Sequence, residues 1–217
     1  MRAKFDEQLH ILNQEMMHMG SMIEDKIQKA IEALIGQNSV LAKEIMEADN
    51  EVDREQKKIE NICFNLLMQQ QPVARDLRVI SAAMKMVTDM ERIGDHAADI
   101  SEMTVMMASE PYVVDLSDIK KMASETVLML IRSIEAYVEK DMLKAQSVID
   151  HDDIVDELFN KVKQELIEMI RKNPAVSEQA ADMLMVAKYF ERIGDHATNL
   201  AELIIFALDD KKNTMQN

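Results

Sequence analysis

Apolar residues recur at steps of three and four positions along most of this chain, with polar residues between them. The opening segment shows the pattern most clearly, at Phe5, Leu9, Leu12, Met16, Met19, Ile23, Ile27, Ala30 and Leu34. Such spacing places the apolar side chains on one face of an α-helix. The pattern therefore predicts a long amphipathic helix over residues 1–34.

Breaks in the pattern divide the chain into six helices of this kind. Asn38 can cap the second helix, and Pro72, Pro111 and Pro174 interrupt the chain between helices. The six predicted helices cover residues 1–34, 38–69, 73–108, 117–138, 141–171 and 177–208. Because the connections are short, successive helices should run antiparallel.

One heptapeptide, Glu-Arg-Ile-Gly-Asp-His-Ala, occurs twice, as residues 91–97 and again as residues 191–197. An internal repeat of this kind indicates that the two halves of the chain are built alike. Each copy falls on the last helix of a group of three. The sequence therefore predicts an all-α fold of two tandem three-helix bundles, with domains at residues 1–110 and 111–217.

The Glu and the Asp of each copy lie on the apolar face of their predicted helix. At about 100° per residue, Glu91 and Asp95 share one stripe with apolar neighbours, as do Glu191 and Asp195. A carboxylate without a partner on such a face costs on the order of several kcal/mol. We therefore expect these side chains to be protonated, paired with a cation or bound to a metal ion.

A second pair of acids lies on the middle helix of each predicted bundle. If these acids face the first pair, each bundle gathers four carboxylates, a set of hard oxygen ligands that suits Mg, Mn, Fe or Zn ions. The candidate metal ligands are Asp49, Asp53, Glu91, Asp95, Asp152, Asp156, Glu191 and Asp195. For any single pair the alternative is a solvated helix face, where acids four positions apart are common.

The histidines and arginines of the repeat are considered separately from these acids. His96 and His196 follow the Asp by one position, about 100° around the helix, so we expect them to pack or hydrogen-bond at the flank of the site. A role as metal ligands is the alternative. Arg92 and Arg192 are expected to pair with acids one turn away, with anion binding as the alternative.

Composition and the motifs that are missing together favour a binding or regulatory protein. The chain of 217 residues has a formal net charge of -15, which argues against nucleic acid because phosphate binding needs clustered Lys and Arg. A signal-peptide core and an uncharged stretch of about 18 residues are both missing, and Cys63 is the single cysteine, so we expect a cytoplasmic protein. Phosphate-binding glycine loops, nucleophile elbows and paired cysteines are also missing, so we predict that it is not an enzyme.

Several segments together resemble the PhoU family of bacterial phosphate-signalling regulators. They are Met1-Arg2-x-x-Phe5, Met19-Gly20, Gln71-Pro72, Asp76-Leu77-Arg78 and the two Glu-Arg-Ile-Gly-Asp-His segments. The resemblance implies tandem three-helix bundles, and it implies that the eight acids belong to signatures that hold metal clusters in some members. It also implies repression of the phosphate-starvation response through two partners, the ATPase subunit of the phosphate ABC transporter and a sensor histidine kinase.

On this hypothesis the protein associates with the membrane only through its protein partners. A homodimer is possible. One departure from the family pattern is visible, because Asn199 follows the second repeat where the first has Asp99. The added negative charge predicts that the two halves differ in metal occupancy. The alternative function is a carboxylate-bridged metalloenzyme or a metal-storage bundle.

Overall fold

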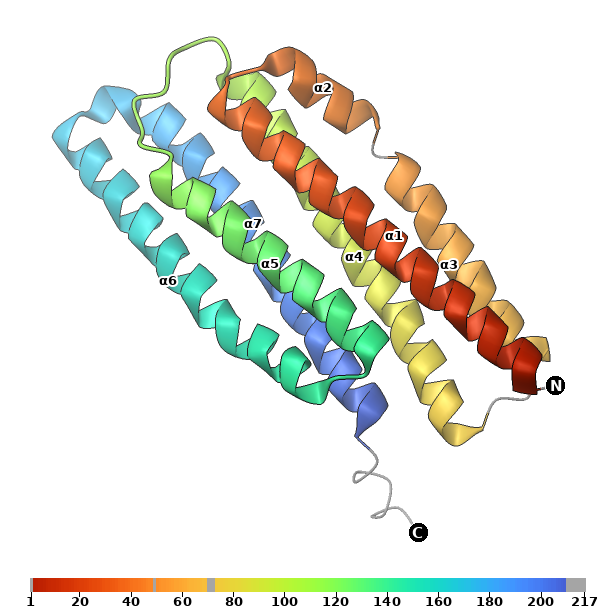
Figure 1. Cartoon of the computed structure of the whole chain (residues 1–217). Helices are drawn as coiled ribbons and strands as arrows, with labels where there is room; N and C mark the ends of the chain where they lie inside the picture. Colours follow the sequence, from red (N-terminus) through yellow and green to blue (C-terminus); the bar gives the residue numbers. More distant parts are fainter. Residues whose placement is uncertain (1, 49, 70–72, 210–217) are drawn as a thin grey trace.

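The described part of the chain is helical except for the turns and the linker that join the helices. The computed structural model describes residues 2–48, 50–69 and 73–209, and these ranges contain helices and turns without a strand (Figure 1). The helices are α1 (Arg2–Ile35), α2 (Ser39–Glu47), α3 (Asn50–Gln69), α4 (Ala74–Met107), α5 (Ser117–Glu139), α6 (Met142–Lys172), the 3₁₀ turn η1 (Pro174–Val176) and α7 (Ser177–Leu208). The predicted all-α class is confirmed.

The helices form two bundles that lie side by side (Figure 1). In the first half, α1 packs against α2, α3 and α4, and in the second half α5, α6 and α7 pack against one another. The halves meet where α4 packs along α7 and α1 packs along α5. We call the contact of α4 with α7 the seam. The predicted pair of tandem bundles is confirmed, and the boundary between residues 110 and 111 stays a prediction.

The second predicted helix is two helices, α2 and α3. Asn38 caps α2 as predicted, since its Oδ1 accepts hydrogen bonds from the backbone N–H groups of Val40 (3.2 Å) and Leu41 (3.1 Å). The helix ends at Glu47, and the N–H of Ala48 still bonds to carbonyls of α2. The apolar spacing continues from α2 into α3, so the pattern gave no sign of this break.

The linker between the halves is held by two glutamine side chains. Gln179, near the start of α7, accepts a hydrogen bond from the N–H of Val113 (2.7 Å) and donates one to the carbonyl of Pro111 (3.1 Å). Gln37, in the turn between α1 and α2, donates to the carbonyl of Glu110 (2.6 Å). The linker is therefore fastened to both halves.

The core runs through both halves and uses methionine as a major filler. The fully buried large side chains include Met16, Met19, Met86, Met90, Leu12, Ile23 and Phe190. Cys63 is also fully buried, and burial raises the pKa of its thiol to about 12, so the thiol stays protonated. None of the described helices combines the length and the apolar character needed to cross a lipid bilayer.

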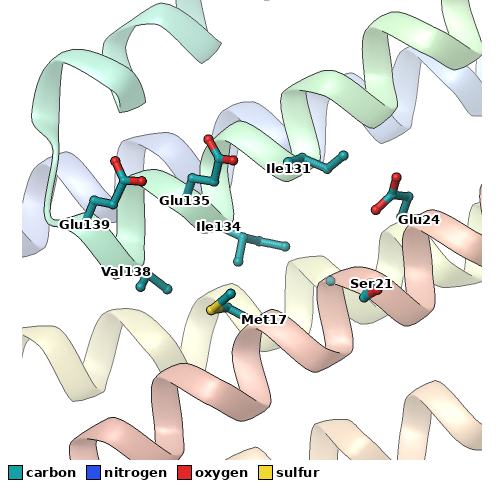
Figure 2. A pocket seen from close by; sticks show the side chains of 9 residues that line it. Met17, Ser21, Glu24, Ile131, Ile134, Glu135, Val138 and Glu139 are labelled. Atoms are coloured by element: carbon teal, nitrogen blue, oxygen red, sulfur yellow. The ribbon is translucent and has the colours of Figure 1, made fainter.

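A close approach of α1 to α5 depends on Gly20. A Cβ atom at this position would lie 2.1 Å from Cδ1 of Ile134, so the missing side chain makes room for the isoleucine. Beside this contact runs a groove of about 310 Å³ with Met17 on one wall and Val138 on the other (Figure 2). α1 and α5 therefore touch at a small residue and leave a shallow apolar channel next to it.

Candidate metal centre

The two repeat copies occupy matching positions, on α4 and on α7. The motif glycines are buried and let the middle helix of each half approach. A Cβ atom on Gly94 would lie 3.2 Å from Cγ1 of Val52 in α3, and one on Gly194 would lie 3.4 Å from Cγ1 of Val155 in α6. Glycine at these positions brings the acids of the middle helix close to those of the motif.

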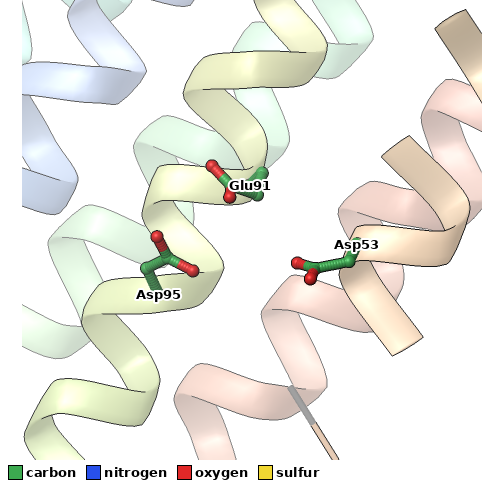
Figure 3. A group of neighbouring side chains, drawn as sticks. All are labelled: Asp53, Glu91 and Asp95. Atoms are coloured by element: carbon green, nitrogen blue, oxygen red, sulfur yellow. The ribbon is translucent and has the colours of Figure 1, made fainter. Parts of the chain in front are cut away.

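In the first half, three predicted acids converge. Asp53 of α3 and Glu91 and Asp95 of α4 are all partly buried, and each offers a carboxylate oxygen within 4.8 Å of the other two. Figure 3 shows Asp53 reaching across from α3 toward the two side chains of α4. We call these residues the first-half cluster. The fourth predicted member, Asp49, lies outside the described residues.

Arg92 pairs with the first-half cluster from the solvent side. Its Nη1 lies 3.3 Å from Oδ2 of Asp95, and its Nε lies 3.7 Å from Oε2 of Glu91. The guanidinium side chain is 58% exposed, so water weakens its attraction for the carboxylates. The expected pairing of Arg92 with nearby acids is therefore present, and it offsets only part of the repulsion between the three carboxylates.

In the second half, the carboxylate of Asp152 is repelled by the other predicted acids. Burial, followed in order by the charges of Asp156, Asp195, Glu191 and Asp153, raises the pKa of Asp152 to about 6. Asp152 therefore lies near the other three predicted acids. Within the described ranges, however, three metal-binding side chains with ligand atoms all within 4.8 Å occur only in the first half.

A lysine lies beside one of the second-half acids. The ammonium of Lys188 forms an ion pair with Oε2 of Glu191 and lies 5.5 Å from the ring centroid of Phe159. Sequence reasoning passed over Lys188, although it precedes Glu191 by three positions, a spacing at which helical side chains meet. Glu191 therefore already has a cation beside it.

The motif histidines lie at the seam, as expected for side chains at the flank of the acids. The rings of His96 and His196 are 5.6 Å apart between centroids. Nδ1 of His96 lies 3.0 Å from Oδ2 of Asp99, and Nδ1 of His196 lies 2.8 Å from Oδ1 of Asp89. Burial lowers the pKa of His96, although its bond to Asp99 acts in the opposite direction.

The departure from the repeat at Asp99 and Asn199 also falls at the seam. Asp99 pairs with His96, whereas the amide of Asn199 donates to Oδ1 of Asp89 (3.3 Å). Sequence reasoning missed Asp89, which precedes His96 by seven positions, or about two helical turns. That spacing places it on the same face of α4 as His96, and this was the available signal.

A protein-family model matches the chain twice. The model is described as the PhoU domain, and it matches residues 16–104 and residues 119–204. The matched segments each contain one copy of the repeat.

Curated proteins give the same result over nearly the whole length. The chain is 38% identical over 212 residues to the "Phosphate-specific transport system accessory protein PhoU homolog" of Clostridium acetobutylicum, with 97% of each chain covered. It is 34% identical over 189 residues to the protein of the same name from Aquifex aeolicus, covering 87% of this chain and 86% of that protein.

Two solved structures share the fold. PhoU from Pseudomonas aeruginosa superposes with a TM-score of 0.89 at 29% identity, covering 94% of this chain and 98% of that one. The phosphate transport system regulatory protein PhoU from Streptococcus pneumoniae superposes with a TM-score of 0.86 at 25% identity, covering 94% and 96%.

Proposed function

Because this chain belongs to the PhoU family, we propose that it is an accessory regulator of phosphate uptake. The observation that supports this most directly is the match to relatives named as accessory proteins of the phosphate-specific transport system, which covers almost the full length of both chains. Both halves also match the PhoU domain. The proposal concerns regulation through protein contacts and includes no catalytic step.

The proposed partners are the ATPase subunit of the phosphate ABC transporter and a sensor histidine kinase, on the cytoplasmic side of the membrane. When phosphate is sufficient, the protein holds the kinase in the state that represses the starvation response. Such a switch requires that the protein bind two states of a partner with different affinity. The net charge of -15 suits docking on basic surfaces, and it steers association more than it sets affinity.

The first-half cluster fits a divalent metal ion. Asp53, Glu91 and Asp95 supply oxygen ligands from two helices, the donor type that Mg, Mn, Fe and Zn accept in carboxylate sites. A bound divalent ion would offset two of the three negative charges of the cluster and hold α3 against α4. Asp49, Asp152, Asp156, Glu191 and Asp195 remain candidate ligands on the sequence pattern.

Deletion of the gene tests the regulatory proposal. In phosphate-rich medium, a reporter of the phosphate-starvation response should be switched on in the deletion strain and repressed again when the gene is restored. Normal repression in the deletion strain contradicts the proposal. Purification of the tagged protein from phosphate-replete cells should recover the transporter ATPase and the kinase.

The first-half cluster also supports a second candidate, a carboxylate metalloenzyme or metal store. Elemental analysis of the purified protein, combined with oxidase and phosphatase assays, separates the two functions. Turnover that disappears in Glu91→Ala would favour the enzyme. Metal content without turnover, together with loss of repression in the deletion strain, would favour the regulator.

A further inference from the structure

The two motif helices differ at the position three residues before the motif glutamate. In α7 this residue is Lys188, whose ammonium pairs with Glu191. In α4 it is Thr88, which is exposed and whose hydroxyl donates to the backbone carbonyl of Met84 at 3.5 Å. At this position the second half therefore has a positive charge that pairs with the motif glutamate. The first half has a neutral hydroxyl that bonds to its own helix.

A second difference supports the lysine. The contacts of the motif glycines with Val52 and Val155 align the middle helices of the two halves. In this alignment Phe159, whose ring lies 5.5 Å from the Lys188 ammonium, corresponds to Gln56 in the first half. An ammonium over an aromatic face is attracted to it, most strongly where water is partly excluded. The second half thus has both the cation and a ring that holds it.

The arginines of the motif also lie differently, because Arg92 pairs with Glu91 and Asp95 whereas Arg192 lies 6.0 Å from the ring centroid of Tyr189. Arg92 lies on the solvent side of its acids and is 58% exposed. The side chain of Lys188 is 36% exposed and that of Glu191 is 15% exposed, so this pair is less screened by water. A divalent ion would have to displace the ammonium from Glu191 and then lie close to it, at an electrostatic cost.

We propose that Lys188 acts as a built-in cation that closes the second half to divalent metal, so that the chain binds its ion in the first half alone. This inference rests on the metal site proposed for the first-half cluster. It agrees with the convergence of three carboxylates in that half only, among the residues that the structure describes.

Isothermal titration calorimetry of the metal-stripped protein with Mn²⁺ counts the bound ions. The wild-type chain should bind one ion, and Lys188→Thr should bind two. The double variant Glu91→Gln, Asp95→Asn should bind none. Adding Lys188→Thr to this double variant should restore one ion, now in the second half. Circular dichroism checks that each variant keeps its helices.

Three further variants serve as controls. Lys188→Arg keeps a cation beside Glu191 and should leave the count at one. Lys85→Thr removes an exposed lysine of α4 and should also leave it at one. The reciprocal change Thr88→Lys should weaken binding in the first half by about tenfold or more, because it places a like charge beside the ion.

These titrations distinguish a failure of the proposed first-half metal site from a failure of the proposed role of Lys188. If the wild-type chain binds no ion, the metal site of the first half is wrong, and the comparison of wild type with Lys188→Thr still decides the role of the lysine. A gain of one ion in Lys188→Thr supports that role even then. Mn²⁺ binding by the double variant with Lys188 intact overturns the inference, as does an unchanged count in every Lys188→Thr protein.

Discussion

Asp152 has the most perturbed carboxyl group of the acidic motifs. Its pKa is raised to about 6 by burial and by four neighbouring carboxylates, whereas an aspartate in the unfolded chain titrates near 3.9. Between these two pH values the folded protein holds a proton that the unfolded chain has released. The folded state therefore loses stability as the pH rises from about 4 to about 6, and the full penalty applies above that.

Replacing Asp152 with Asn removes this penalty. In the presence of EDTA, the midpoint of thermal unfolding should rise by about 3 °C at pH 7.5, and the gain should vanish toward pH 4. The measurement is thermal unfolding followed by circular dichroism at both pH values. Glu168→Gln, a change at an exposed residue later in the same helix, is the control. An equal gain at pH 4 and pH 7.5 would rule out the titration as its cause.

For single residues, the sequence predicted which acids lie together. It did not predict which cations pair with them. Helical periodicity and the repeat placed Glu91, Asp95 and Asp53 on facing stripes. The ion pair of Lys188 was visible in its spacing from Glu191, but the choice of rotamer and the ring of Phe159 depend on packing between α6 and α7. Sequence periodicity carries no information on that packing.

Helix α6 begins with a side chain that caps its first turn. Its N-cap is Asp141, whose Oδ1 accepts hydrogen bonds from the N–H groups of Leu143 (2.9 Å) and Lys144 (3.0 Å). Asp141→Ala leaves these donors without their acceptor and should lower the free energy of unfolding by about 1 kcal/mol. Urea unfolding measures the loss, with Glu168→Ala, an exposed substitution later in the same helix, as the control. Equal losses in the two variants would contradict a capping role.

Most helix ends were predicted to within a residue or two. Long apolar stripes mark the extent of each helix, and prolines mark where several of them stop. The exceptions have local causes. The break between Glu47 and Asn50 lies within a continuous stripe, so periodicity ran through it. At α5 the residue in the capping position is Leu116, which makes no side-chain capping bond, and Asp115 accepts a hydrogen bond from the N–H of Ser117 (3.0 Å).

On the scale of the whole molecule, the linker tests how the halves are joined. Gln179→Ala removes two hydrogen bonds to the linker, and each such bond contributes about 1 kcal/mol. Cleavage by chymotrypsin after Tyr112 should therefore be at least about fivefold faster than in the wild type. Electrophoresis of timed digests measures this rate, and Gln164→Ala on the exposed face of α6 is the control. An unchanged rate would show that Gln179 does not hold the linker.

The arrangement of the halves was the part least accessible to sequence reasoning. The repeat predicted two similar bundles, but not that the helices carrying it would pack against each other. The seam depends on contacts such as those of His196 with Asp89, more than 100 positions apart. Long-range pairings of this kind leave no local pattern in a single sequence.

The chain crosses between the halves once, at the linker that joins the end of α4 to the start of α5 (Figure 1). α4 contains 34 residues, so its other end is about 50 Å away at a rise of 1.5 Å per residue. A rotation of about 5° around the linker would move that far end by about 4 Å. Because α4 packs along α7, any such change in the angle between the halves would displace the contacts of the seam most at the end far from the linker.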